Sequence, residues 1–374
     1  MKIAIDSRSA TLHAGSGIGT YTKNLVLNLL NINSSDKLNI IWTGDLPSDI
    51  KKDKADIFLI SGRHGEFYER FYVPNLLIKN DIDLYHIPQN GIGFPFDSSI
   101  NTIVTIHDLI PYIMPETVGK GYLKRFLRDM PYIISQASGI ITVSEYSKKD
   151  ILRFFPEFPE EKILVTPLAA NTTFKPIDKN LCKKYIKDTF KIDSPFILYV
   201  GGFSKRKNVK ELIISFKKVK NSLKKDYKLL IAGSLRDEGI YLKDFVSSEG
   251  LSDSIIFTGF IEDSILPILY NAAEAFVYPS LYEGFGLPPL EAMSCKTPVI
   301  TSNLTSIPEV TSDAAILINP HNIDDLSSAL ITLLNNENLK DTLAEKGYKR
   351  SLNFTWKKTA KKTFDAYKKI MDII

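Results

Sequence analysis

The stretch AFVYPSLYEGFGLPPLEAM, from Ala275 to Met293, passes from an apolar run through a glycine-containing loop into a segment that opens with two prolines. The apolar run AFVYPS has the composition of a buried strand. Pro288 or Pro289 fits the first turn of a helix, where a missing N–H costs nothing. Because open parallel sheets bind ligands outside the carboxyl ends of their strands, this unit predicts an α/β fold with a ligand site in the loop.

The same alternation of short apolar runs and amphipathic stretches continues along the whole chain. It is typical of parallel sheets with helices on both faces. The expected strands are KIAID, NIIWT, DIFLI, DLYHI, TIVTIHD, GIITVS and KILVTP in the first half, and FILYVGG, KLLIAGS, IIFTG, AFVYPS, TPVITS and AAILIN in the second. We therefore expect an α/β protein of two Rossmann-like, doubly wound parallel-sheet domains.

The boundary between these domains is expected in the segment TPLAANTTFKPID, Thr166 to Asp178, where small polar residues and prolines replace the periodic hydrophobic pattern. This places the first domain at residues 1–170 and the second at 171–352, with a ligand cleft between them. Residues 353–374 predict an amphipathic helix with aromatic residues broadly on one side and lysines elsewhere. We expect this helix to pack back across the boundary.

The size and composition of the chain disfavour membrane-spanning, metal-binding and nucleic-acid-binding proteins. With 374 residues, 44% of them hydrophobic and 24% charged, the chain has the balance of a soluble globular protein with more than one domain. It has no run of ~20 apolar residues and no signal-peptide core, so we expect a cytoplasmic protein. Cys182 and Cys295 lie far apart, and no ligand spacing indicates a metal. The net charge of +4 arises after Lys175 and suits one anionic small molecule, not a nucleic acid.

The loop quoted first carries two carboxylates that suit a polyhydroxylated ligand. Glu283 lies in the loop, and Glu291 is expected in the first turn of the following helix. The amides of Phe285, Gly286 and Leu287 can donate to hydroxyl or phosphate oxygens, while the carboxylates accept from hydroxyls. A sugar nucleotide offers hydroxyls at its hexose end and at its ribose end. Two alternatives stay open: Glu283 as a solvated loop acid, and Glu291 as a charge that complements the helix dipole.

A second loop, GGFSKRKNVKEL, follows the strand FILYV. Glycines such as Gly202 let the backbone approach a ligand. Arg206 and Lys207 lie just before a predicted helix, where cations oppose the helix dipole, so their presence favours an anion site for phosphate. The alternative is a solvated, basic start of a helix.

These motifs resemble those of the retaining glycosyltransferases of family 4, and the resemblance runs from GIGTY to the last helix. The segment EGFGLPPLE looks like the Glu-x7-Glu motif of that family, with Glu283 and Glu291 in its two positions. The resemblance implies a GT-B fold of two facing Rossmann-like domains, the N-terminal one binding the acceptor and the C-terminal one the nucleotide sugar. It also implies that Glu283 and the following amides bind the donor hexose, and that Glu291 binds the donor ribose.

The basic loop resembles the diphosphate loop of the same family, with Lys207 as the family's lysine. Many members place an arginine about five residues earlier, where this chain has Gly202 or Phe203. We expect Arg206 to supply the second positive charge instead. This substitution of one cation for another is a hypothesis about this chain.

In the first domain, VTIHDLIPY ends a strand with His107 and Asp108. The resemblance implies that His107 lies against the transferred sugar, while Asp108 either orients His107 or caps the next segment. The glycines of AGSGIGTYTKNLVLNLL, Gly17 among them, correspond to a loop that approaches the donor phosphate and the acceptor. A nicotinamide fingerprint with Asp45 is the alternative there, but the spacing GxGxG and the distance from the strand KIAID disfavour it.

The predicted activity is transfer of a hexose from a nucleotide sugar to a hydroxyl of a glycan or lipid-linked acceptor in cell-surface polysaccharide synthesis, with retention at the anomeric carbon. His107 and Glu283 are the expected catalytic residues. The expected donor-binding residues are Gly17, Gly202, Arg206, Lys207, Phe285, Gly286, Leu287 and Glu291, and no metal or other cofactor is expected. The motif HDLIPYIMPE is similar to that of mannosyltransferases of bacterial surface polysaccharides, which favours GDP-mannose, with a UDP-hexose as the alternative donor. A GT-B phosphorylase or epimerase and a non-catalytic sugar-nucleotide-binding partner are the rival functions.

Three further segments are interpreted structurally. The basic amphipathic stretch 120–134 is either a solvated helix over the core or a contact with an anionic membrane at the inner face of the plasma membrane. Ser144 and Ser147 are expected as helix caps. Ser306 and Glu309 have the spacing of a capping box, which leaves them outside the predicted site.

Overall fold

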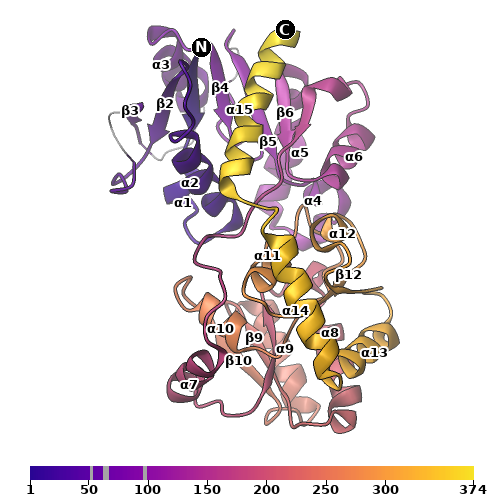
Figure 1. Cartoon of the computed structure of the whole chain (residues 1–374). Helices are drawn as coiled ribbons and strands as arrows, with labels where there is room; N and C mark the ends of the chain where they lie inside the picture. Colours follow the sequence, from indigo (N-terminus) through magenta and orange to yellow (C-terminus); the bar gives the residue numbers. More distant parts are fainter. Residues whose placement is uncertain (51–53, 62–66, 96–98) are drawn as a thin grey trace. The chain divides into compact units, whose positions relative to one another are not determined.

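The computed structural model describes residues 1–50, 54–61, 67–95 and 99–374. The chain divides into two compact units, the first formed by Met1–Ala169 together with Thr355–Ile374 and the second by Ala170–Phe354 (Figure 1). The change of unit at Ala169 falls inside the linker segment that lacks periodic hydrophobic residues. Each unit is built around its own parallel sheet.

The sheet of the first unit has seven strands in the order β3-β2-β1-β4-β5-β6-β7, all paired in parallel. Its strands are β1 (Lys2–Asp6), β2 (Lys37–Trp42), β3 (Asp56–Leu59), β4 (Leu84–Ile87), β5 (Asn101–Ile106), β6 (Gly139–Thr142) and β7 (Ile163–Val165). Its helices are α1 (Ser9–Leu12), α2 (Gly17–Leu29), η1 (Tyr68–Tyr72), α3 (Val73–Lys79), α4 (Ile110–Ile113), η2 (Pro115–Thr117), α5 (Lys120–Gln136), α6 (Glu145–Phe154), η3 (Glu160–Lys162) and α15 (Trp356–Ile373).

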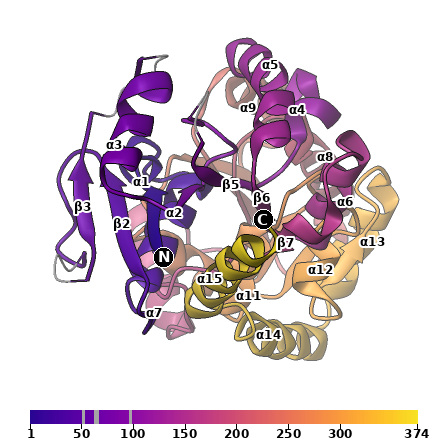
Figure 2. The same ribbon diagram turned by 90° about the horizontal axis from the view of Figure 1, so that it is seen from above.

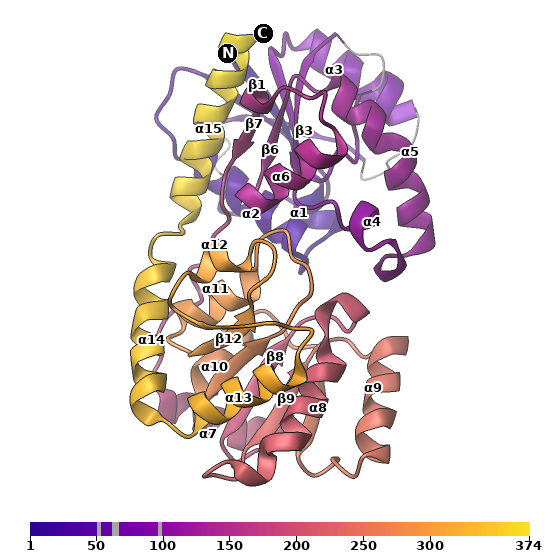
Figure 3. The ribbon, with the colours of Figure 1, turned by 90° about the vertical axis from the view of Figure 1, so that its right-hand side faces the viewer.

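The sheet of the second unit has six parallel strands in the order β10-β9-β8-β11-β12-β13. Its strands are β8 (Phe196–Val200), β9 (Lys228–Ala232), β10 (Ile255–Gly259), β11 (Ala275–Tyr278), β12 (Val299–Ser302) and β13 (Ile316–Ile318). Its helices are α7 (Lys179–Phe190), η4 (Lys205–Lys207), α8 (Val209–Val219), η5 (Lys220–Ser222), α9 (Asp237–Ser248), α10 (Leu266–Ala272), α11 (Leu287–Ser294), α12 (Ile307–Thr311), α13 (Ile323–Leu334) and α14 (Glu337–Ser351). Figure 3 shows α8 beside α13 and α14 beside α11, two pairs of helices that are in contact.

Both sheets begin at a central strand, add two strands on one side and then continue on the other side of that first strand. This order creates a switch point beside β1 and β8, where the loops on either side diverge and leave room for a ligand. All the expected strands form, and the central ones, such as β1, β4, β5 and β11, are apolar runs buried along almost their whole length. The prediction of two doubly wound parallel-sheet domains is therefore confirmed.

The last helix, α15, packs within the first unit, beside α2 (Figures 1 and 2). It begins at Trp356, not at 353, because the side chain of Thr355 caps it by accepting from the amide of Lys358. Tyr367 is fully buried, and its hydroxyl lies 2.6 Å from Nδ1 of His86 in β4. Gly139 in β6 leaves space for Ile370, since a Cβ there would lie 2.4 Å from that side chain. These contacts attach the end of the chain to the first sheet.

Helix α5 contains the basic stretch 120–134, and its apolar residues pack into the core of the first unit. Phe126, Met130 and Ile133 are buried in the cluster around β4 and β5. No helix within the described ranges is both long enough and apolar enough to cross a membrane. Contact of α5 with a membrane surface stays a prediction.

Candidate functional site

The loop after β8 approaches its neighbours closely because glycines line the path. The carbonyl of Gly202 accepts a hydrogen bond from the hydroxyl of Tyr199, 2.6 Å away. A Cβ on Gly233, in the loop after β9, would lie 2.1 Å from the carbonyl oxygen of Gly201. Residue 233 must therefore be glycine for these two loops to lie side by side. This packing fixes the start of η4, which carries the basic residues.

Arg206 and Lys207 in η4 converge on the carboxylate of Glu283 from the loop after β11. Arg206 Nη1 lies 2.8 Å from Glu283 Oε1, and Lys207 Nζ lies 2.7 Å from the same oxygen. All three side chains are largely buried, with exposed fractions of 14%, 14% and 12%. Two cations thus meet one carboxylate here, and guanidinium and ammonium groups brought together in this way suit a phosphate.

Two residues of β11 and its loop complete the surroundings of Glu283. The hydroxyl of Ser280 donates to Glu283 Oε1 at 2.5 Å, and that of Tyr278 donates to it at 3.0 Å. Lys207 also contacts the Tyr278 hydroxyl and lies 5.0 Å above that ring. Desolvation opposes ionisation of the carboxyl, but Lys207 and Arg206 outweigh it and lower the pKa of Glu283 to about 2. Glu283 is therefore a buried, ionised carboxylate and not a solvated loop acid.

The Glu283 loop is also held from the other side, by the segment after β12. The hydroxyl of Ser306 donates to the carbonyl of Glu283 at 2.8 Å and to that of Phe285 at 2.9 Å. The amide of Glu283 donates to Thr305 Oγ1 at 3.2 Å. Ser306 makes no side-chain cap for α12, so the capping-box prediction for Ser306 and Glu309 was wrong. Its hydroxyl supports the candidate site instead.

Gly286 lets the loop turn into α11. Its φ of 114° is a conformation that side chains rarely adopt, and a Cβ there would lie 2.7 Å from Ile307. Helix α11 then starts at Leu287, with Pro288 in its first turn as expected. The first N–H groups of a helix lack partners within that helix, so the amides of this turn suit a ligand oxygen. The Phe285 ring packs edge-on against the ring of Phe354, and this contact helps to hold the loop in place.

Glu291 lies in a different environment from Glu283. It is the fifth residue of α11, so the prediction that it lies in the first turn was wrong: the helix starts at Leu287, after the left-handed Gly286. Its Oε2 accepts from the hydroxyl of Tyr270 in α10 at 3.1 Å. Desolvation raises the pKa of Glu291 to about 8, so at neutral pH this carboxyl carries a proton and can both donate and accept. That combination suits the vicinal hydroxyls of a ribose.

In the first unit, His107 follows β5 and is 8% exposed. Its Nε2 lies 2.9 Å from the carbonyl oxygen of Pro88, and its ring packs edge-on against Tyr21. A carbonyl can only accept, so Nε2 carries the proton and Nδ1 is left as an acceptor. Burial lowers the pKa of His107 to about 4. His107 is thus a neutral imidazole with a fixed tautomer.

The other predicted residues of the first unit have simpler surroundings. Asp108 Oδ1 accepts from the amide of Ile110, the first residue of α4, at 3.1 Å. Gly17 is the exposed first residue of α2, after the cap residue Ser16. Ser144 caps α6, as expected, by accepting from the amide of Ser147, but the prediction that Ser147 is also a cap was wrong: it is the third residue of the helix, and its hydroxyl donates to the carbonyl of His107. Across the described ranges, no group of three or more His, Cys, Asp or Glu side chains is arranged to hold a metal ion.

The structure thus brings the predicted residues of the second unit together around two loops, with Arg206, Lys207 and Glu283 in direct contact. Sequence reasoning missed Tyr278, Ser280 and the pair Thr305–Ser306, which hold Glu283 in place. The sequence did contain a signal for Tyr278 and Ser280, since both lie at the carboxyl end of β11, where the ligand loop was expected. No local signal marked the segment after β12.

Comparisons with known proteins show which family the chain is similar to. A family model for "Glycosyl transferases group 1" matches residues 183–350, and one for "Glycosyltransferase Family 4" matches residues 35–174. The O-antigen chain mannosyltransferase B of Escherichia coli is 32% identical over 285 residues, which cover 76% of this chain and 74% of that protein.

Solved structures share the fold of the whole chain. The sucrose-phosphate synthase of Thermosynechococcus elongatus has a TM-score of 0.77 at 20% identity and covers 100% of both chains. HepE of Anabaena, in complex with UDP and glucose, has a TM-score of 0.75 at 15% identity over 98% of this chain and 99% of that chain. At such identities the likeness concerns the fold alone.

Proposed function

The chain belongs to the family 4 glycosyltransferases, and on this premise we propose that it moves a hexose from a nucleoside diphosphate sugar to a hydroxyl of a glycan or lipid-linked acceptor, with retention at the anomeric carbon. The observation that carries the proposal is the contact of Arg206 and Lys207 with Glu283. Arg206 and Lys207 suit a diphosphate, and Glu283 suits sugar hydroxyls. The contact places these two kinds of group side by side. Glu291, protonated beside Tyr270, is the proposed partner of the ribose.

The reaction separates charge, and the proposed roles follow from that. Breaking the bond between hexose and diphosphate develops positive charge on the sugar and negative charge on the leaving group. Arg206 and Lys207 would stabilise the leaving diphosphate, together with the amides at the start of α11. These groups are already oriented by the protein, so little reorganisation accompanies the reaction.

Glu283 and His107 are proposed to hold the transferred sugar. The ionised Glu283 accepts from hexose hydroxyls, and the neutral His107 offers Nδ1 as a further acceptor. We assign no covalent nucleophile, and favour a front-face, ion-pair-like route in which the leaving phosphate accepts the proton of the acceptor hydroxyl. Gly17 is assigned to the loop that approaches the donor phosphate, as in the family motif.

The donor we propose is GDP-mannose. The support is the similarity to the O-antigen chain mannosyltransferase B, together with the segment HDLIPYIMPE. A UDP-hexose is the alternative donor. The expected place of the reaction is the cytoplasmic face of a membrane that carries the acceptor.

The test is product formation from GDP-mannose, UDP-glucose and ADP-glucose, followed by proton NMR of the new anomeric centre or of the released sugar. We expect turnover of GDP-mannose with an α product from the α donor, and no loss of turnover in EDTA. Lys207→Ala should abolish turnover, while Lys243→Ala, an exposed lysine on α9, should not. No turnover with any donor, or a β product, would contradict the proposal.

A further inference from the structure

The chain passes from the second unit back to the first between Phe354 and Thr355, and an aromatic side chain lies on each side of this crossing. Phe354 is the last residue of the second unit, and Trp356 is the first residue of α15 in the first unit. Phe354 contacts Phe285 in the second unit, and Trp356 contacts Tyr21 in the first. Two residues of backbone span at most ~7 Å, so these two contacts are closely connected along the chain.

On the side of the second unit, Phe354 supports the loop that carries Glu283. Its ring packs edge-on against Phe285, with 5.9 Å between the ring centroids. The guanidinium of Arg350 in α14 lies over the Phe354 ring, 5.1 Å from its centroid, and donates to two backbone carbonyls of α12. Helix α12 follows Ser306, whose hydroxyl holds the carbonyl of Phe285. Phe354 therefore belongs to the packing that keeps this loop in one position.

On the side of the first unit, Trp356 supports the residue that packs on His107. Trp356 is 4% exposed, and its ring centroid lies 6.1 Å from that of Tyr21 in α2. The Tyr21 ring meets the imidazole edge-on, with 4.7 Å between the centroids, and its hydroxyl lies 3.2 Å from Oγ1 of Thr105 in β5. Tyr21 is fully buried, so it cannot move independently of the rings that pack on it.

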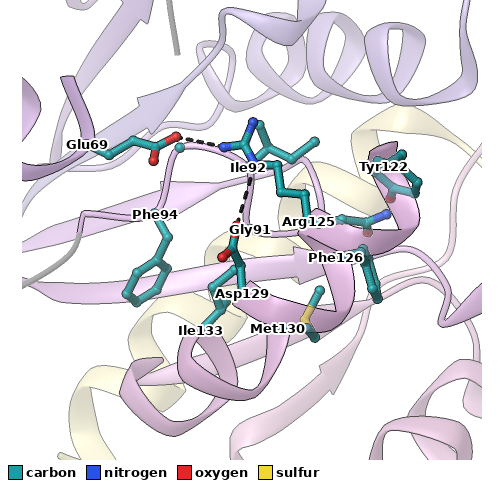
Figure 4. Close-up of a pocket in the computed structure, with 12 residues that line it drawn as sticks. Glu69, Gly91, Ile92, Phe94, Tyr122, Arg125, Phe126, Asp129, Met130 and Ile133 are labelled. Atoms are coloured by element: carbon teal, nitrogen blue, oxygen red, sulfur yellow. Dashed lines mark hydrogen bonds and ion pairs between the residues drawn. The ribbon is translucent and has the colours of Figure 1, made fainter. Parts of the chain in front are cut away.

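A second set of contacts holds His107 through the loop after β4, which lies beside α5 (Figure 4). The amide of His107 donates to Asn90 Oδ1 at 2.7 Å, and its Nε2 donates to the carbonyl of Pro88 at 2.9 Å. A Cβ on Gly91 would lie 2.8 Å from a side chain of α5, so this loop is closely packed. The imidazole is thus held by a packed loop and by Tyr21, and the Tyr21 contact leads back to the crossing.

The backbone between the two rings has little freedom to absorb a movement. Thr355 is extended, with φ of −133° and ψ of 143°, and its hydroxyl accepts from the amide of Lys358 at the start of α15. On the other side, the amide of Phe354 donates to the carbonyl of Ser351 at 3.0 Å. Each residue has only two soft backbone dihedrals. A shift of Phe354 therefore reaches Trp356 unless Thr355 absorbs it.

We propose that Phe354 and Trp356 are positioning residues for the transfer reaction, which together connect the donor loop to His107. The proposal rests on the proposed glycosyltransferase function and adds how ordering of the donor loop reaches the histidine. A donor that orders the loop at Phe285 fixes the Phe354 ring, and Trp356 then fixes Tyr21 and the imidazole. The donor favours one position of His107 because it favours one position of the loop.

The first test is fluorine NMR of the full chain labelled with 5-fluorotryptophan. The chain has two tryptophans, so two resonances are expected, and Trp42→Phe assigns them. Trp42 is buried in β2 and takes no part in the proposed connection, which makes it an internal control. We expect saturating GDP or UDP, whichever binds in isothermal titration, to shift the resonance of Trp356 and to leave that of Trp42 in place.

Variants of the crossing show whether this shift depends on Phe354. Phe354→Ala should reduce the shift of Trp356 at saturating nucleotide at least about twofold, because the contact with Phe285 is lost. Phe354→Tyr, which keeps the ring, and Leu352→Ala, at an exposed position of the same segment, should retain it. A residue that only stabilises the fold would lower the melting temperature and leave the shift unchanged. An equal shift in Phe354→Ala and wild type would overturn the proposal.

Turnover gives a second readout. Trp356→Leu should lower kcat about tenfold, because the imidazole is displaced. The Kd of the diphosphate should be unchanged, since the loops of the second unit are untouched. Trp356→Phe, which keeps an aromatic ring at this position, should recover most of the loss. Equal kcat in Trp356→Leu and wild type would contradict the assigned role of Trp356.

Phe285→Leu distinguishes this proposal from the proposed function, because it alters the donor loop when no nucleotide is present. It should shift the resonance of Trp356 and not that of Trp42. If no nucleoside diphosphate binds while Phe285→Leu still shifts Trp356, the proposed function fails and the connection stands. If a diphosphate binds and neither it nor Phe285→Leu shifts Trp356, the connection fails and the proposed function stands.

Discussion

Lys207 donates to Glu283 across 2.7 Å, although the two residues are 76 positions apart in the sequence. Arg206 donates to the same carboxylate oxygen, so the carboxylate holds both cations in place before any donor binds. This contact links the loops after β8 and β11, which are neighbouring strands of the second sheet although two other strands separate them in the sequence. It also makes the charge state of Glu283 important for the stability of the second unit.

Replacing Glu283 by glutamine should destabilise the protein unless a diphosphate is bound. The substitution leaves two largely buried cations without their counterion, which costs about 3 kcal/mol of the free energy of unfolding. Urea denaturation with and without saturating nucleoside diphosphate measures this, and the diphosphate should stabilise Glu283→Gln more than wild type. Glu238→Gln, at an exposed position on α9, is the control. An unchanged stability of Glu283→Gln would show that the contact is not maintained in solution.

The stability of the wild type should fall as the pH rises through the pKa of Glu291. A carboxyl whose pKa is about 8 in the folded state and about 4.3 in the unfolded chain stabilises the fold fully below the lower value. This stability is lost progressively up to pH 8, because the unfolded chain ionises first. Glu291→Gln should therefore have a melting temperature that declines less between pH 5 and pH 8. Identical declines in the two proteins would mean that Glu291 is ionised at neutral pH.

Removal of the Ser306 hydroxyl should weaken donor binding, although we do not assign Ser306 any contact with the donor. Ser306 supports the carbonyls of Glu283 and Phe285, and the loss of this support costs about 1 kcal/mol of stability. We expect Ser306→Ala to raise the donor Kd by up to about tenfold, since a flexible loop must be ordered on binding. Ser312→Ala, at the end of α12, serves as the comparison. Equal donor affinity in Ser306→Ala and wild type would show that the loop is rigid without this residue.

The pH profile of turnover should contain no ionisation of His107 between pH 5.5 and pH 8. Burial lowers the pKa of His107 to about 4, so the ring stays neutral over this range. His107→Gln should lower kcat/KM by a constant factor of about 100 across the range, because a sugar contact is lost but no titration is removed. A profile with an acid limb near pH 6.5 that disappears in His107→Gln would show that the ring titrates during turnover.

The strands could be predicted from the sequence because each is a short, uninterrupted apolar run between turn residues. β8 and β11 are examples, as FILYV and AFVY are buried throughout their central residues. The pair of loops at their carboxyl ends was predicted for the same reason, since neighbouring parallel strands end at the same edge of a sheet. At β8 and β11, the apolar pattern of the sequence and the geometry of a parallel sheet therefore led to the same prediction.

The supporting contacts were not accessible because they join residues that are distant in the sequence. Ser306 and Glu309 have the spacing of a capping box, yet the Ser306 hydroxyl bonds to carbonyls more than 20 residues earlier. Glu291 was misplaced by one turn because α11 already starts at Leu287, directly after the left-handed Gly286, which makes Glu291 its fifth residue. The partners of His107, at Pro88 and Asn90, also depend on how two loops pack.

We propose that Arg206, Lys207 and Glu283 form the binding site of a nucleoside diphosphate. Isothermal titration of GDP, UDP and ADP into wild type, Lys207→Ala and Lys243→Ala tests it most directly. We expect that one of the three diphosphates binds to wild type and to Lys243→Ala with the same Kd, and at least about tenfold more weakly to Lys207→Ala. Equal affinity for Lys207→Ala and wild type, or no binding of any diphosphate, would contradict it.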